Sequence, residues 1–338
     1  MTGCCATSAP PTTLEELVHQ QFDPLVCKGV IVGASVGIIA NGETTAYFFG
    51  ATKQGAAPPN ANTVYEIGSI SKVFTGTALA KLSLDGAVAL DAPVKNFLPP
   101  EVTVPYCEDR DILLEDLAEQ NSGLPRMPAN FAPKDPQNPY ADYTPEDMYA
   151  YLSGYNLTRC PGVAHEYSNL GVGLLGHALA RSRQTTYEQL IRTLLIDPLG
   201  MPDTAITLTE DQKTRFAQGY ATALDLGVHA WCKEQPAWDL PDAFAGAGGI
   251  RSTLNDMTRF LECAMGQADT PLKPAFTLAE TPRFDIAEGA RIGLNWHLTD
   301  NAALGEALVW HNGETGGYHS FLGFALQKKV GIIVLTNT

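Results

Sequence analysis

The pattern of apolar and polar positions first indicates a helix followed by a β-hairpin. Thr13 and Glu16 form a capping-box pattern in front of apolar residues at helical spacing, which predicts that a helix begins there. The apolar runs GASVGIIA and ETTAYFFG follow, and Asn41 and Gly42 separate them. Asn-Gly between two such runs is a strong signal for a type I′ turn. The N-terminal part is therefore predicted to form a helix and two antiparallel strands.

Helical patterns dominate the middle of the chain. A helix is predicted from Ser69 to about Asp85, where Gly86 ends it. Between residues 91 and 283, helical patterns alternate with proline-rich connections and strand signals are few. Strand signals return in the runs EALVW, GYHSFLGFAL and VGIIVLT, which are rich in β-branched and aromatic residues.

This distribution predicts an α+β fold in which both ends of the chain contribute to one sheet. We predict a discontinuous sheet domain over residues 12–88 and 285–338 and a mainly helical domain over residues 89–284. A small-molecule site is expected in the cleft between them, because clefts between domains are common ligand sites.

Charge narrows the range of partners. The 338 residues carry a formal net charge of −15 and are 45% apolar, which suffices for a large core. A negative field repels phosphate, so nucleic acid and anionic membrane surfaces are disfavoured. The sequence shows no run long and apolar enough to span a bilayer. A small molecule is the expected partner, and the sequence gives no indication of the oligomeric state.

Seven cysteines at wide spacings bear on the compartment. None forms a C-x-x-C pair, which disfavours zinc and thioredoxin-type chemistry. We expect free, mostly buried thiols, and these favour a reducing compartment such as the cytoplasm. The N-terminus lacks the charged and apolar regions of a signal peptide. The periplasm is the alternative if a leader has been removed.

The stretch EIGSISK places Ser69 three residues before Lys72, so both face the same side of the predicted helix. Unpaired N–H groups and the dipole at a helix start stabilise negative charge on an oxygen. A lysine that is partly desolvated favours its neutral, basic form, which can activate a hydroxyl. The pair is therefore a candidate nucleophile and base. An ordinary helix start with a serine cap is the alternative.

Two further stretches favour the interpretation of Ser69 and Lys72 as a nucleophile and its base over that of an ordinary helix start. YSN begins at Tyr167, and HNGETGG begins at His311. Together with SISK, and in this order, they resemble the serine β-lactamase and penicillin-recognising superfamily. The resemblance is strongest to class C β-lactamases, D-alanyl-D-alanine carboxypeptidases and related esterases. Six blocks in family order carry it across most of the chain: YEIGSISKVFTG, LAEQNSGLP, PGVAHEYSNLGVGLLG, DPLGMPDT, GAGGIRSTLNDMTRFL and WHNGETGGYHSFLGF.

The resemblance implies a fold and three catalytic residues. The fold is an antiparallel sheet flanked by helices with a helical insertion domain, and the active site lies in the cleft between them. Ser69 is implied as the nucleophile that forms an acyl-enzyme. Lys72 and Tyr167 are implied to take its proton and to pass one to the leaving group. No metal or cofactor is implied.

Four more residues are implied to bind the substrate: Asn169, His311, Gly313 and Glu314. Asn169 is expected to hydrogen-bond Lys72 and the amide side chain of the substrate. The backbone N–H groups of Ser69 and Glu314 are expected to form the oxyanion hole.

The main departure from the family lies at His311. Class C β-lactamases carry Lys-Thr-Gly where this chain has His-Asn-Gly. Lysine keeps a positive charge for a substrate carboxylate, whereas histidine is largely neutral at pH 7. If His311 binds such a carboxylate, affinity for acidic substrates should rise as the pH falls from 8 to 6. The alternative is a neutral hydrogen-bonding partner of Tyr167 or of its own strand.

We therefore predict a serine hydrolase acting on a small ester or amide, similar to an esterase or to a D-alanine carboxypeptidase or aminopeptidase. A true β-lactamase that hydrolyses β-lactam antibiotics is the first alternative. A non-catalytic penicillin-binding or scaffold protein is the second.

Overall fold

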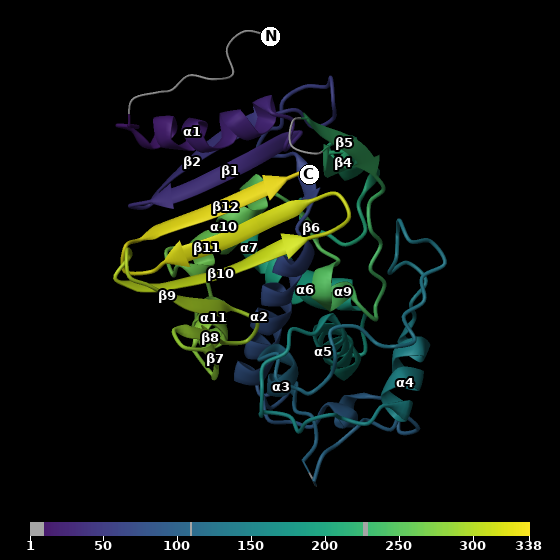
Figure 1. Cartoon of the computed structure of the whole chain (residues 1–338). Helices are drawn as coiled ribbons and strands as arrows, with labels where there is room; N and C mark the ends of the chain where they lie inside the picture. The colour runs from purple at the N-terminus through teal and green to yellow at the C-terminus, as the bar shows by residue number, and fades with distance from the viewer. Residues whose placement is uncertain (1–9, 109, 226–228) are drawn as a thin grey trace.

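An eight-stranded antiparallel sheet forms the centre of the computed structural model, which describes residues 10–108, 110–225 and 229–338 (Figure 1). In spatial order its strands are β2 (Glu43–Gly50), β1 (Gly33–Ala40), β12 (Val330–Thr336), β11 (His319–Ala325), β10 (Glu306–Glu314), β9 (His297–Asn301), β8 (Ala290–Ile292) and β7 (Phe284–Ala287). Ala34 of β1 lies opposite Thr336 of β12, so the two ends of the chain pair directly. The predicted α+β fold is confirmed.

The predicted N-terminal elements are also present. Helix α1 (Leu14–Cys27) begins with a capping box, in which the Glu16 N–H donates to Thr13 Oγ1 and the Thr13 N–H donates to the Glu16 carboxylate. Asn41 and Gly42 join β1 to β2 with φ angles of 53° and 82°, as a type I′ turn requires. Val18 of α1 packs on the face of β1 and β2 that points away from the other helices.

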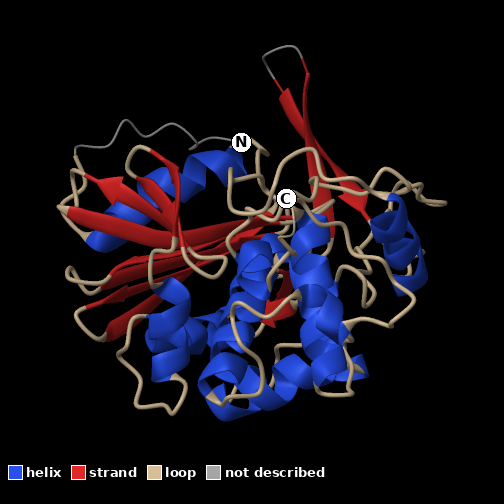
Figure 2. Cartoon of the chain, turned by 90° about the horizontal axis from the view of Figure 1, so that it is seen from below, coloured by secondary structure: helices blue, strands red, loops and turns tan. Residues whose placement is uncertain are grey.

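The remaining helices lie on the other side of the sheet (Figure 2), and among them α10 packs directly on β1, β11 and β12. These are α2 (Ser71–Leu84), α3 (Leu114–Ala118), α4 (Pro145–Gly154), α5 (Asn169–Ser182), α6 (Tyr187–Ile191), α7 (Asp197–Leu199), α8 (Glu210–Thr214), α9 (Ala245–Gly248), α10 (Leu254–Ala264) and α11 (Lys273–Glu280). Short 3₁₀ turns span Gly68–Ile70 and Val94–Phe97, and a π-helical segment spans Arg192–Ile196.

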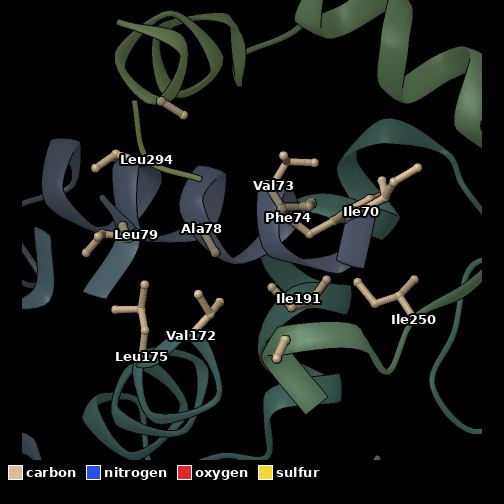
Figure 3. Packing of buried hydrophobic residues seen from close by; sticks show 14 of the residues in the cluster. Ile70, Val73, Phe74, Ala78, Leu79, Val172, Leu175, Ile191, Ile250 and Leu294 are labelled. Carbon is tan, nitrogen blue, oxygen red and sulfur yellow. The ribbon is translucent and has the colours of Figure 1, made fainter. Parts of the chain in front are cut away.

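Helix α2 runs through the middle of this group of helices and is buried on nearly all sides (Figure 3). Phe74 stacks on Phe260 of α10 with ring centroids 4.0 Å apart. At Gly76 a Cβ would come within 1.9 Å of the Leu294 carbonyl oxygen, so only glycine allows this close approach. Even the polar residues Ser71, Lys72 and Thr75 of this helix are buried, so α2 lies inside the core. Packing therefore fixes the start of α2, where Lys72 lies, directly after the turn that carries Ser69.

Two predictions about local structure are corrected. The α-helix begins at Ser71, and Ser69 lies in the 3₁₀ turn before it, because Gly68 at φ 51° turns the chain there. A hairpin of β4 (Gly219–Asp225) and β5 (His229–Gln235) lies in the region where few strands were expected, and it projects from the rest of the chain (Figure 2). A short pair, β3 (Val64–Glu66) and β6 (Arg251–Thr253), precedes the helix starts of α2 and α10.

The expectation of free thiols was wrong at several positions. Cys107 and Cys160 form a disulfide, with Cα atoms 5.2 Å apart, and Cys27 is disulfide-bonded too. Of the other cysteines in the described ranges, Cys232 and Cys263 are free. A separation of 53 residues along the chain gives no sign of such proximity in space. The inference of a reducing compartment loses its basis, since disulfides persist in oxidising compartments.

No helix within the described part of the chain is long and apolar enough to cross a membrane. The division into domains at residues 88/89 and 284/285 stays a prediction.

Candidate active site

Two glycines bring the Ser69 turn against the end of β10. A Cβ on Gly68 would lie 2.7 Å from the Glu314 backbone nitrogen, and a Cβ on Gly313 would lie 2.0 Å from the Ile67 carbonyl oxygen. Ser320 of β11 donates its hydroxyl to the same Ile67 oxygen at 2.7 Å. Side chains larger than hydrogen at the two glycines would push these segments apart. The turn is thereby held next to the backbone of Glu314.

Lys72 lies within hydrogen-bonding distance of Ser69. Its Nζ is 2.9 Å from Ser69 Oγ and donates to the Ala247 carbonyl oxygen of α9 at 2.6 Å. The side chain is fully buried. Burial, and then the positive charge of Arg126, hold the pKa of Lys72 well below its usual range. The neutral amine is therefore favoured, and a neutral amine can accept the proton of a hydroxyl.

Tyr167 precedes α5 and approaches the same pair. Burial raises the pKa of Tyr167 to about 12, although a hydrogen bond with the Ser69 side chain lowers it in part. Lys72 Nζ lies 4.8 Å from the centre of the tyrosine ring, and Arg126 Cζ lies 5.0 Å from it. Because of the raised pKa, the phenol keeps its proton and can serve as an acid.

His311 of β10 is buried beside these groups. Its ring centroid is 6.4 Å from that of Tyr167, and its Nδ1 lies 2.6 Å from the Asn312 carbonyl oxygen. A carbonyl oxygen accepts, so Nδ1 carries the hydrogen and Nε2 presents a lone pair. Burial, followed by the nearby His297 and Lys72, holds the pKa of His311 well below its usual range. Protonation between pH 8 and 6 is disfavoured, which favours the neutral alternative over a charged, carboxylate-binding His311.

Asn169 makes different contacts from those expected. Its side-chain Nδ2 donates to Met127 Sδ at 3.8 Å, and its side chain also hydrogen-bonds Tyr140. The expected bond to Lys72 is replaced by those that Lys72 makes to Ser69 and Ala247. Asn169 is the first residue of α5, and Ser168 is the N-cap whose hydroxyl accepts the Gly171 N–H.

Glu314 ends β10 with its side chain in solvent, 3.7 Å from His319 Nε2. The backbone of Glu314, and not its side chain, therefore faces the Ser69 turn. A small hollow of about 30 Å³, with room for about two waters, opens beside Ser69. Within the described ranges, no cluster of three or more His, Cys, Asp or Glu side chains is arranged to hold a metal.

Comparison with known proteins places this site in a family. The β-lactamase family model matches residues 14–338. The chain is 27% identical over 359 residues to a β-lactamase of Pseudomonas fluorescens, covering 96% of this chain and 94% of that protein. It is 27% identical over 340 residues to AmpH, a D-alanyl-D-alanine-carboxypeptidase/endopeptidase of Escherichia coli (strain K12), covering 96% of this chain and 84% of AmpH.

A class C β-lactamase solved in complex with cefoxitin superposes with a TM-score of 0.83 at 25% identity, covering 96% of this chain and 93% of that one. The chain belongs to the β-lactamase family. It is a serine hydrolase of the class C β-lactamase-like group, which includes AmpH. The family expected from the sequence motifs is confirmed.

In this β-lactamase-family chain, several residues of the site were not expected from the motifs. The hollow beside Ser69 is lined by Asn169 and Glu314, and also by Tyr140, Trp238, Leu240, Ala247, Gly248 and Thr315. Tyr140 packs against Trp238 and Phe244 with centroid distances of 5.4 and 5.1 Å. These aromatic residues lie on loops distant in sequence, so no local pattern marks them as neighbours of the nucleophile.

A buried ion pair supports Trp238. Glu66 Oε1 accepts from the Trp238 N–H at 2.8 Å, and Arg251 Nη2 donates to the Trp238 carbonyl oxygen at 2.6 Å. Glu66 and Arg251 also pair with each other at 3.3 Å across β3 and β6. Burial raises the pKa of Glu66, and the Arg251 charge opposes that rise. In this β-lactamase-family site the pair thus fixes the backbone of one wall of the hollow.

Proposed function

We propose that this chain hydrolyses a small ester or amide through an acyl-enzyme on Ser69. The observation that carries the proposal is the 2.9 Å contact between Ser69 Oγ and the buried amine of Lys72. The lowered pKa of Lys72 supports its role as the base that takes the hydroxyl proton. Ser69 Oγ then bonds to the substrate carbonyl carbon, and the carbonyl oxygen takes up negative charge.

In the proposed mechanism, the backbone N–H groups of Ser69 and Glu314 donate hydrogen bonds to this negatively charged oxygen. Such a donor typically contributes about 2.7–4 kcal/mol to lowering the barrier. Tyr167, which keeps its proton up to high pH, gives it to the departing oxygen or nitrogen as the bond to carbon breaks. The proton held by Lys72 replaces the one that Tyr167 has lost. A water then hydrolyses the Ser69 ester by the same path in reverse.

Ester or peptide hydrolysis ranks above β-lactam hydrolysis because of His311. A neutral, buried histidine stands where class C β-lactamases carry a charged lysine. The named activity of AmpH supports a carboxypeptidase-like substrate. The β-lactamase alternative has support from the β-lactamase of Pseudomonas fluorescens and from the superposition on a cefoxitin complex.

A panel of three substrates tests the proposal. Wild type and Ser69→Ala are compared on p-nitrophenyl acetate, on a D-alanine amide and on nitrocefin. Turnover of the ester or the amide that disappears in Ser69→Ala supports the proposal. Turnover of nitrocefin alone supports the β-lactamase alternative. Covalent labelling of Ser69 by penicillin without turnover of any of the three supports a non-catalytic penicillin-binding protein.

We infer further that the chain works in an oxidising compartment, in place of the cytoplasm expected from the sequence. The disulfide between Cys107 and Cys160 and the bonded state of Cys27 support this. Counting free thiols in protein unfolded without a reductant tests it. Seven reactive thiols would contradict the inference.

A further inference from the structure

An arginine that the family motifs do not include lies at the catalytic tyrosine. Arg126 Cζ is 5.0 Å from the centre of the Tyr167 ring, and the Arg126 side chain is exposed. Its carbonyl oxygen accepts the N–H groups of Asn169 and Leu170 at 3.1 and 3.3 Å. The backbone of Arg126 is therefore fixed to the start of α5. The guanidinium lies over the tyrosine ring, on a side chain that is exposed to solvent.

Arg126 has no carboxylate partner within the described ranges. The charge of Arg126 acts on the site, because it adds to the effect of burial in lowering the pKa of Lys72 and opposes the rise that burial causes in the pKa of Tyr140. An unpaired guanidinium beside a reactive group is available to an anion that enters with the substrate.

The other basic groups of the site do not supply a positive charge. Lys72 is buried and favours its neutral form, and His311 is buried and favours its neutral form as well. Among the residues that line the hollow beside Ser69, Glu314 alone carries a formal charge, and that charge is negative. Arg126 is thus the fixed cation of the site as far as the described residues show.

We propose that Arg126 recognises a carboxylate on the leaving group of the substrate. The proposal rests on the function proposed above, in which Tyr167 protonates the leaving group. A cation 5.0 Å from the centre of the Tyr167 ring then lies near the leaving group. The guanidinium can bind both oxygens of a carboxylate at once. The preferred substrates are therefore esters or amides that release an acidic alcohol, phenol or amine component.

A matched pair of esters tests this preference. Both 3-carboxyphenyl phenylacetate and 3-carbamoylphenyl phenylacetate have the same acyl group, and their leaving groups differ only in the carboxylate. We expect wild type to show a higher kcat/KM on the acidic ester. Arg126→Gln should lower the ratio of the two kcat/KM values by about 10- to 100-fold, as for the loss of one charge-assisted contact. Arg126→Lys should restore part of the ratio.

Arg183→Gln provides the control, because it removes the same charge from the exposed end of α5, about 20 Å along the helix from Asn169. This variant should leave the ratio unchanged. The ratio in wild type should also fall as salt rises, since exposed charges are screened. An equal ratio in wild type and Arg126→Gln would overturn the proposal.

Binding to the inactive protein separates this proposal from the proposed hydrolysis. In Ser69→Ala, we expect 3-hydroxybenzoate to bind more tightly than 3-hydroxybenzamide by ligand-detected NMR, and the added change Arg126→Gln should abolish the difference. That result would support Arg126 even if neither ester were turned over, which would contradict the hydrolysis. Equal binding of the two phenols to Ser69→Ala would overturn the role of Arg126 whatever the turnover.

Discussion

Gly313 lies so close to Ile67 that a Cβ on the glycine would come within 2.0 Å of the Ile67 carbonyl oxygen. One residue on, Glu314 lies against Gly68 of the Ser69 turn. This contact connects β10 to the nucleophile across about 245 residues of chain. A change of one methyl group at Gly313 should therefore alter the distance between the two proposed oxyanion donors.

Gly313→Ala should lower both stability and activity. The clash is with backbone, so the strand must shift, and overpacking of this kind costs about 1–3 kcal/mol. A shift near 1 Å in the site should lower kcat by about 10²-fold. Urea unfolding and ester turnover measure the two effects. Gly154→Ala is the control, because a Cβ there meets nothing within 4 Å. Wild-type activity in Gly313→Ala would contradict this account.

Tyr167→Phe should lose rate without losing stability. The ring and its contacts with Lys72 and Arg126 are kept, and only the hydroxyl that approaches Ser69 is removed. We expect kcat to fall by about 10²–10⁴-fold, as for loss of a general acid. Steady-state kinetics and a thermal melt check this. Tyr106→Phe, at an exposed position, should behave as wild type. A folded Tyr167→Phe with full activity would rule out the acid role.

The dependence of activity on pH should follow Lys72 and Tyr167. The reactive form has a neutral Lys72 and a protonated Tyr167. Lys72 has its pKa held below the lysine range, so kcat/KM should fall as the pH drops through that lowered value. Tyr167 loses its proton near pH 12, so no decline is expected between pH 8 and 10. Ester kinetics from pH 5 to 10 measure the profile. A decline between pH 8 and 10 would contradict the assignment.

The same lowered pKa should affect stability. The unfolded chain binds a proton at Lys72 more readily than the folded chain does, because the pKa of Lys72 is lower in the folded state. The folded state therefore loses stability as the pH falls from the pKa of Lys72 in the unfolded chain to its pKa in the folded chain. Lys72→Met removes this effect. Its free energy of unfolding relative to wild type should rise as the pH falls from 10 to 7, while turnover is lost. Urea unfolding at several pH values measures it. A relative stability that does not change with pH would contradict a buried, neutral Lys72.

Removal of the Cys107–Cys160 disulfide should destabilise the fold. A cross-link over 53 residues restricts the unfolded chain, and such bonds typically contribute about 2–4 kcal/mol. The double variant Cys107→Ser, Cys160→Ser should lose about that much in urea unfolding. Cys232→Ser, at a free thiol, should lose less. Equal unfolding midpoints for the double variant and wild type would show that the bond does not form.

Short sequence motifs predicted those residues of the site that lie in or next to a recognisable motif. Ser69 and Lys72 are three residues apart, so their proximity follows from helical geometry, and the structure brings Tyr167 to them. The sheet and its first hairpin followed from runs rich in β-branched and aromatic residues and from the Asn41-Gly42 turn.

Contacts between distant segments were not predictable in this way. Trp238 reaches the site because Glu66 and Arg251 hold its backbone, and those two residues are 185 positions apart. Arg126 and the disulfide likewise depend on where loops meet. The lowered pKa of His311 results mainly from complete burial, which its sequence neighbours do not indicate.

The most direct test of the proposed mechanism is the site of covalent labelling. Wild-type protein is treated with a fluorophosphonate, digested and analysed by peptide mass spectrometry. We expect the adduct on Ser69 alone, and we expect Ser69→Ala to remain unlabelled while it melts at the wild-type temperature. An adduct on another residue, or undiminished labelling of Ser69→Ala, would contradict the account of Ser69 as the nucleophile.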